Sequence, residues 1–223
     1  VAEVLDMDVD CLDNQLANSQ IEDVDFIKLD AQGSELAILE GSTKTLNNVW
    51  GVEVEVEFTK LYKDQPLFAD VDNFLRQFGF QLFDLRPFYW KRKHGKKYGR
   101  LKGQIIFADA LYLLDINQLH SRLSDIRDDF DRKAKFLKAI SIAILYGYVD
   151  YAAALFKEKK DFFNEAEIQT FYRVLERGIP LSVKIPYFRG RARVAKLFKN
   201  LYWMFRLHTD HWAISGESLG NLD

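Results

Sequence analysis

A short segment around Asp30 constrains the fold of this chain more than any other feature. Residues 24–29 are mainly apolar, as in a strand that is covered on both faces, and Asp30 follows directly. Gly33 then permits a tight turn, and Ser34 is a suitable N-cap for a helix that begins at Glu35. Open α/β sheets bind ligands at the carboxyl ends of their strands. The segment therefore predicts an α/β fold with a site that begins at Asp30.

The same alternation of strand and helix continues to about residue 116. Strands are predicted over 3–10, 24–30, 51–58, 80–85 and 104–114, with a short helix from residue 12 and helices over 35–46 and 70–78. Between residues 51 and 58 the alternation is strict, and it places Glu53, Glu55 and Glu57 on one face and valines on the other.

Beyond residue 116 the apolar residues recur with a helical period. Helices are predicted over 119–146 (as one helix or two), 150–160, 165–177 and 191–207. We therefore divide the chain into an α/β portion, residues 1–116, and a helical extension, residues 117–223.

Composition narrows the class of protein. At 48% apolar residues, the chain can bury a real core. A single cysteine, Cys11, excludes an internal disulfide framework and fits a reducing, cytoplasmic location. No apolar run reaches transmembrane length, and no secretory pattern opens the chain. Because the first residue is Val1, we expect the chain to be cut from a longer one.

The run DFIKLDAQGSELAILEG, residues 25–41, resembles the signature of FkbM-type methyltransferases. That signature is roughly D-hydrophobic-I-K-hydrophobic-D-x-E-G-x-E-x-x-V-L-x-G. Leu12-Asp13 upstream resembles the family's L-D pair, and residues 53–62 resemble its E-V-x-F…L-Y strand. The resemblance covers about residues 3–114. One departure is Gln32, which stands where the family usually has Glu.

The resemblance implies a class I methyltransferase that uses S-adenosylmethionine and has a Rossmann-like sheet of strand order 3-2-1-4-5-7-6. Members mostly methylate hydroxyl groups of sugars or natural products. The chain shows no glycine-rich loop after a first strand and no acidic end to a second. We therefore expect an incomplete Rossmann-like sheet followed by an all-helical region. Residues upstream of Val1 would bind most of the cofactor, and the isolated fragment would be inactive.

Three carboxylates are the candidate catalytic residues: Asp30, Glu35 and Glu57. Each is predicted near the methyl acceptor, as a general base or a hydrogen-bond acceptor for its hydroxyl. The alternative is a solvated Asp at a strand end and a Glu that only complements the helix dipole. Lys28 is predicted to pair with Asp30. Carboxylates gathered here could also hold Mg²⁺, although we favour a site without metal.

The candidate substrate-binding residues are Glu55, Tyr62 and Trp90. Trp90 lies within a basic stretch, residues 86–102, whose aromatic and basic side chains are able to stack on sugars or bind phosphates and uronates. The alternative is a solvated hairpin connection. No nucleic-acid-binding module accompanies these charges, so we predict a small-molecule or glycan acceptor.

A second basic stretch, residues 184–207, has helical spacing with apolar residues on one face. Such a helix is able to lie on an anionic membrane surface, which predicts peripheral membrane contact. The alternative is a helix docked on its own domain.

Three functional hypotheses follow. The first is an S-adenosylmethionine-dependent O-methyltransferase, present as its acceptor-side portion. The second is a non-catalytic interaction module or pseudoenzyme whose helical region binds a partner or a membrane. The third is a glycosyltransferase that uses the carboxylates of residues 6–10, a pattern that is common by chance.

Overall fold

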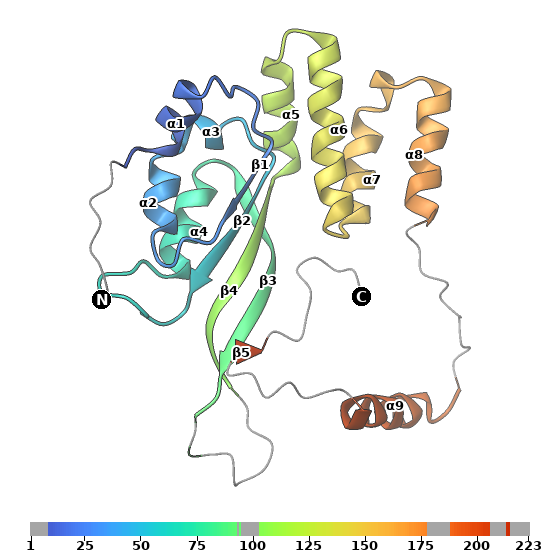
Figure 1. The fold of residues 1–223 in the computed structure, drawn as a ribbon. Coiled ribbons are helices and arrows are strands. Elements are labelled where there is room, and N and C mark those ends of the chain that lie inside the picture. The colour runs from blue at the N-terminus through green and yellow to red at the C-terminus, as the bar shows by residue number, and fades with distance from the viewer. Residues whose placement is uncertain (1–8, 93, 95–102, 178–187, 206–212, 215–223) are drawn as a thin grey trace.

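The computed structural model describes residues 9–92, 94, 103–177, 188–205 and 213–214, and places them in a mixed α/β fold (Figure 1). The sheet has the order β1-β2-β4-β3-β5. Its strands are β1 (Phe26–Leu29), β2 (Gly51–Glu57), β3 (Phe80–Trp90), β4 (Gln104–Leu114) and β5 (Ala213–Ile214). Strands β1 and β2 are parallel, whereas β2–β4, β3–β4 and β3–β5 are antiparallel pairs.

Four helices accompany the first strands, and the rest follow β4. The first group is α1 (Leu12–Asn18), α2 (Glu35–Glu40), α3 (Thr43–Leu46) and α4 (Phe68–Arg76). The second group is α5 (Ile116–Asp125), α6 (Asp129–Leu145), α7 (Val149–Glu158), the 3₁₀ turn η2 (Lys160–Phe162), α8 (Glu165–Arg177) and α9 (Arg191–Phe205). None of the helices in the described part of the chain has the length and apolar character needed to cross a membrane.

Most of the predicted elements are confirmed, and the differences have physical causes. The helix predicted over 35–46 is divided into α2 and α3, and Asp13 of α1 caps the second piece. Its carboxylate accepts hydrogen bonds from the backbone N–H groups of Lys44 and Thr45, at 2.8 and 2.9 Å. Strand β3 runs to Trp90, beyond the predicted end at residue 85, because β4 pairs with it along its whole length.

Three predicted features fall partly outside the described residues. Residues 3–8 of the strand predicted over 3–10 lie outside them, and Val9 and Asp10 belong to no strand. The carboxylates of the third functional hypothesis are therefore mostly outside as well. Of the basic hairpin connection, residues 93 and 95–102 lie outside the described part. Residues 184–187 and 206–207 of the second basic stretch also lie outside.

The valine face of β2 forms the centre of the core. Val52, Val54 and Val56 are fully buried, and Leu39 of α2 and Leu75 of α4 belong to the same apolar cluster. Figure 1 shows α2 and α4 side by side against this part of the sheet. Burying these valines forces the intervening glutamates onto the opposite face, since side chains alternate along a strand.

The opposite face is covered at one end by three tyrosines from the corner between α6 and α7. Tyr148 donates a hydrogen bond to the backbone oxygen of Phe83 at 3.0 Å, and Tyr151 donates to that of Leu114 at 2.6 Å. Tyr146 donates to the Glu53 carboxylate. The corner therefore covers the amino ends of β2 and β3 and leaves the acidic end of β2 beyond it.

The helices after β4 share one core with the sheet. Leu119, Phe136 and Phe156 are almost fully buried and belong to the same apolar cluster as the valines of β2. Half-buried Arg122 of α5 adds a polar connection, because its guanidinium donates to the backbone oxygens of residues 46, 49 and 78 at 2.6–2.9 Å. Helix α5 is thus bound to the ends of elements from the first half of the chain.

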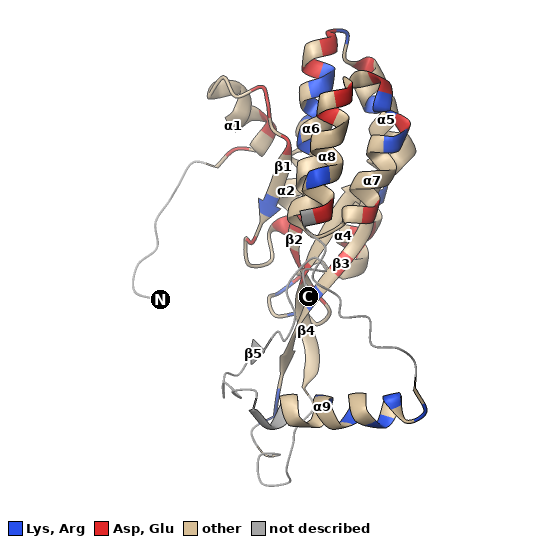
Figure 2. Ribbon diagram, turned by 90° about the vertical axis from the view of Figure 1, so that its right-hand side faces the viewer, with Lys and Arg blue, Asp and Glu red and all other residues tan. Residues whose placement is uncertain are grey.

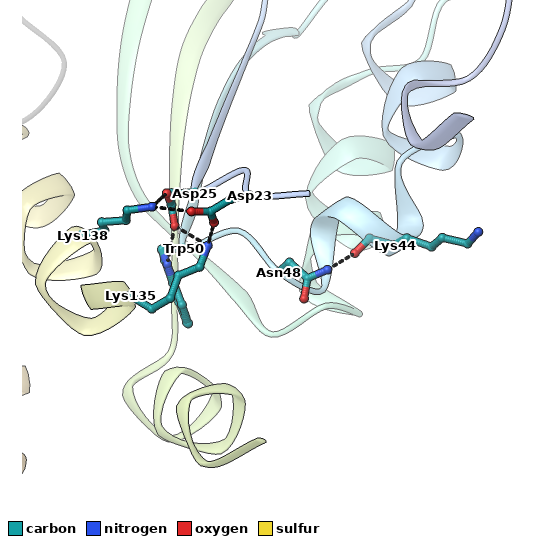
Figure 3. Close-up of polar contacts among 7 residues, drawn as sticks. All are labelled: Asp23, Asp25, Lys44, Asn48, Trp50, Lys135 and Lys138. Atoms are coloured by element: carbon teal, nitrogen blue, oxygen red, sulfur yellow. Dashed lines mark hydrogen bonds and ion pairs between the residues drawn. The ribbon is translucent and has the colours of Figure 1, made fainter. Parts of the chain in front are cut away.

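Helix α6 is also joined to the segment that leads into β1 (Figure 3). Lys135 contacts the carboxylates of Asp23 and Asp25, and Lys138 contacts the same two at 2.6–2.7 Å. Asp25 also accepts a hydrogen bond from the indole N–H of Trp50 at 3.2 Å. This cluster fixes the start of β1 against both α6 and the start of β2.

Candidate functional site

The three glutamates on the acidic face of β2 have different surroundings. Glu53 is buried and paired, since it contacts the Lys28 ammonium group and accepts a hydrogen bond from the hydroxyl of Tyr146. Lys28 lies directly beside Glu53 in the parallel register. The predicted pairing of Lys28 with Asp30 is therefore wrong, because the adjacent strand offers a carboxylate on the same face.

Within the described part of the chain, no cation binds Glu55 or Glu57, which lie further along β2. Burial raises the pKa of Glu55 to about 8, and the negative charges of Asp30, Glu57, Glu35 and Asp109 add to this effect. Burial also raises the pKa of Glu57 to about 7, with a further contribution from Glu35. These shifts place Asp30, Glu35, Glu55 and Glu57 within electrostatic reach of one another at the carboxyl end of the parallel pair.

Asp30 and Tyr62 are linked through the side chain of Gln32. The Gln32 amide nitrogen donates to the Asp30 carboxylate at 3.0 Å, and the Tyr62 hydroxyl donates to the Gln32 amide oxygen at 3.3 Å. A glutamate at position 32 would lack the donor that Asp30 uses. Gln32 therefore orients Asp30 in a way that the family's usual residue would not.

Glu35 shapes the turn between β1 and α2. It is almost fully buried, and its two carboxylate oxygens accept hydrogen bonds from the backbone N–H groups of Ala31 and Gly33, at 2.7 and 2.9 Å. Gly33 has a φ of +101°, and a Cβ on it would lie 2.9 Å from the Gln65 amide nitrogen. The turn thus needs glycine for both its conformation and its closeness to residue 65.

Gln65 connects this turn to the loop after β2. Its amide oxygen accepts from the backbone N–H groups of Leu61 and Tyr62, at 2.9 and 3.1 Å. Its amide group faces Glu57 and partly offsets the rise in the pKa of that carboxyl. Gln65 and Glu57 are both about 3% exposed, so this contact lies beneath the surface of the site.

Asp109 of β4 completes an acidic group whose other members are Asp30, Glu35, Glu55 and Glu57. It faces Glu55 in the antiparallel register, and the guanidinium of Arg86 binds its carboxylate, with Nε at 2.7 Å. The sequence contained a signal for it, since Asp109 is the only charged residue in the otherwise apolar strand 104–114. Gln65 gave no comparable signal, because its role depends on contacts with two separate loops.

The structure brings together five of the six predicted site residues. Asp30, Glu35, Glu55 and Glu57 interact electrostatically, and Tyr62 joins them through Gln32. Trp90 lies apart from them, since it pairs with Gln104 near the far end of the hairpin. Strand β4 lies between β3, which carries Trp90, and β2.

A shallow pocket lies beside the turn after β1. Its volume is about 530 Å³, and it is bordered by Gly33, Ser34, Lys60, Gln65 and Pro66 among other residues. Gly33 and Gln65 border this pocket and also lie next to the acidic group, whereas Asp30 and Glu55 do not border the pocket. Within the described residues, no three His, Cys, Asp or Glu side chains are arranged to hold a metal ion.

Residues 2–82 match the family model described as the methyltransferase FkbM domain. The match includes β1, β2 and every member of the acidic group except Asp109. The strand order β1-β2-β4-β3 is also the order of strands 4-5-7-6 in the sheet that the resemblance implies. Comparisons with curated proteins and with solved structures gave no significant match.

Proposed function

We propose, from the agreement of residues 2–82 with the FkbM methyltransferase family, that this chain takes part in S-adenosylmethionine-dependent methylation of a hydroxyl group on a sugar, glycan or natural product. In this proposal the described residues form the acceptor side of the active site.

One observation carries the proposal: the acidic group at the carboxyl end of β1 and β2 contains two carboxyls, Glu55 and Glu57, whose pKa values are raised to about 8 and 7. A nearby positive charge favours the ionised form of such carboxyls. The sulfonium of S-adenosylmethionine is a positive charge of this kind, so the residues fit the cofactor. When bound, the cofactor supplies an electrophilic methyl group.

The residues divide into those that face the acceptor and those that hold the site in shape. We assign Asp30, oriented by Gln32, and half-buried Glu55 to the acceptor hydroxyl. A carboxyl with a pKa near the working pH is suited to accept the hydroxyl proton. Glu35 positions the turn after β1, because both of its oxygens are already bound to backbone N–H groups. Glu57, held beneath the surface beside Gln65, adds negative charge.

The pH dependence of cofactor binding tests this assignment. S-adenosylmethionine carries the sulfonium charge, whereas S-adenosylhomocysteine has a neutral sulfide. As the pH rises from 6 to about 8.5, Glu57 and Glu55 lose their protons. We therefore expect the affinity for S-adenosylmethionine to rise relative to that for S-adenosylhomocysteine. Isothermal titration calorimetry measures both, in this chain and in any longer protein that its gene encodes.

One variant tests the role of Glu55 directly, and a second serves as its control. Glu55→Gln should reduce the rise in relative affinity, whereas Glu165→Gln, at an exposed position of α8, should leave it unchanged. Equal pH profiles for the two ligands would overturn the assignment of Glu55. Failure of this chain, and of any longer protein that its gene encodes, to bind either ligand would overturn the methyltransferase proposal and favour the interaction-module hypothesis.

A further inference from the structure

Helix α9 exposes a continuous apolar face. The exposed fractions of Leu197 and Phe198 are 57% and 65%, and those of Val194 and Leu201 are about 40%. Helical spacing places these four side chains on one side of the helix. Both views show α9 apart from the helices that cover the sheet (Figures 1 and 2). The face is therefore not used for packing within the described part of the chain.

The charged residues of α9 are all basic. Lys196 and Lys199 lie on the side opposite the apolar face, Arg193 lies at its flank, and Arg189 and Arg191 stand at or just before the start of the helix. Residues 188–205 include no Asp or Glu. Figure 2 shows the contrast with α5 to α8, which carry both acidic and basic residues, whereas α9 shows only basic ones. The helix thus combines apolar area with charge of a single sign.

We propose that α9 binds the surface of an anionic lipid bilayer, with its axis in the plane of the membrane. The apolar side chains enter the boundary between head groups and acyl chains, and the basic side chains contact the anionic head groups. The helix has 15 residues, so it lies on the bilayer and does not cross it.

Charge complementarity favours a lipid surface over a second copy of the chain. Two α9 helices packed through their apolar faces would bury those faces but would leave the basic side chains without an opposite charge, because residues 188–205 include no Asp or Glu. An anionic bilayer offers both an apolar layer and opposite charge. The proposal does not depend on methyl transfer, since none of the acidic site residues belongs to α9.

Vesicle co-sedimentation of the full chain tests the proposal. We expect binding to vesicles of phosphatidylcholine mixed with phosphatidylserine, weak binding to phosphatidylcholine alone, and release by added salt. The double variant Lys196→Glu/Lys199→Glu should weaken partitioning at least about tenfold, since each basic residue near the surface favours binding. Replacing both Leu197 and Phe198 by Glu should abolish it.

Matched variants elsewhere control for general effects of charge and exposure. Leu145→Glu changes a 72% exposed leucine of α6, and Lys157→Glu/Lys160→Glu reverses two exposed charges outside α9. Both should bind vesicles like the parent chain. Three outcomes would overturn the proposal: no binding to anionic vesicles, equal loss of binding in the control variants, or a dimer in solution that Leu197→Glu dissociates.

Discussion

Glu53, Glu55 and Glu57 occupy equivalent positions on one strand face, yet of the three only Glu53 has a bound cation among the described residues. Lys28 and Tyr146 reach it from β1 and from the end of α6. The other two lie beyond that reach and next to further carboxyls, so the protonated form is favoured at both. At the scale of single residues, the proposed site on β2 therefore lies at Glu55 and Glu57, where Lys28 does not reach, and not at Glu53.

This difference predicts a pH dependence of stability. The folded-state pKa values of Glu55 and Glu57 lie above the value of 4.5 for a solvated Glu, so the folded chain binds more protons than the unfolded chain between about pH 5 and 8. The free energy of unfolding should fall as the pH rises through this range and level off above it. Glu55→Gln should flatten the fall between pH 7 and 8, measured by urea unfolding.

Two comparisons separate the effect of the glutamates from other causes of pH dependence. Burial lowers the pKa of His120, which makes stability rise with pH, but only near and below its ordinary value of 6.5. Measurements above pH 7 therefore separate its effect from that of the glutamates. Glu165→Gln should keep the parent profile, and identical profiles for Glu55→Gln and the parent would contradict the raised pKa of Glu55.

At the scale of elements, α6 is a helix that connects the helical extension to the α/β portion of the chain. In the middle of α6, Lys135 and Lys138 bind Asp23 and Asp25 (Figure 3). Just after its end, Tyr146 binds Glu53. These contacts join segments that are more than ninety residues apart. The orientation of β1, and with it the position of Asp30, depends on this helix.

Asp25→Ala should therefore lower the free energy of unfolding by about 2 kcal/mol, because it leaves two ammonium groups and an indole N–H with fewer partners. Urea unfolding followed by tryptophan fluorescence measures the loss. Asp129→Ala, whose side chain is 92% exposed, is the matched control and should cost less than about 0.5 kcal/mol. If Asp25→Ala lowers the free energy of unfolding no more than the small loss expected for Asp129→Ala, the cluster adds no stability.

At the scale of the whole molecule, one apolar cluster extends from the sheet into α8. Arg122 lies within this connection and binds three backbone oxygens of the first half of the chain. A shared core predicts that the α/β portion and helices α5 to α8 unfold together. The boundary near residue 117 stays a prediction that unfolding experiments are able to test.

Arg122→Met should lower the free energy of unfolding by about 3 kcal/mol, since it leaves buried carbonyl groups without their donor. The transition should remain single, with tryptophan fluorescence and far-UV circular dichroism coinciding. Arg76→Met removes an exposed ion pair within α4 and should have little effect. Two separate transitions would show instead that the portions on either side of residue 117 unfold independently.

The sequence by itself determined the elements whose signals are local. The alternation of residues 51–58 predicted β2 and the common face of its glutamates, and helical spacing predicted α8 at its observed bounds. The motif of residues 25–41 predicted the family that the match over residues 2–82 supports. Local periodicity suffices for these features, because it reports which side of an element faces the core.

Only the tertiary structure decided which side chains meet. Strand register decides that Lys28 pairs with Glu53 and that Trp90 lies apart from the acidic group. The path of the loop after β2 decides that Gln65 lies beside Glu57. The hydrogen bonds that Glu35 accepts from the backbone N–H groups of the turn after β1 are likewise visible only in the structure. Such contacts join residues far apart in the chain, and periodicity carries no information about them.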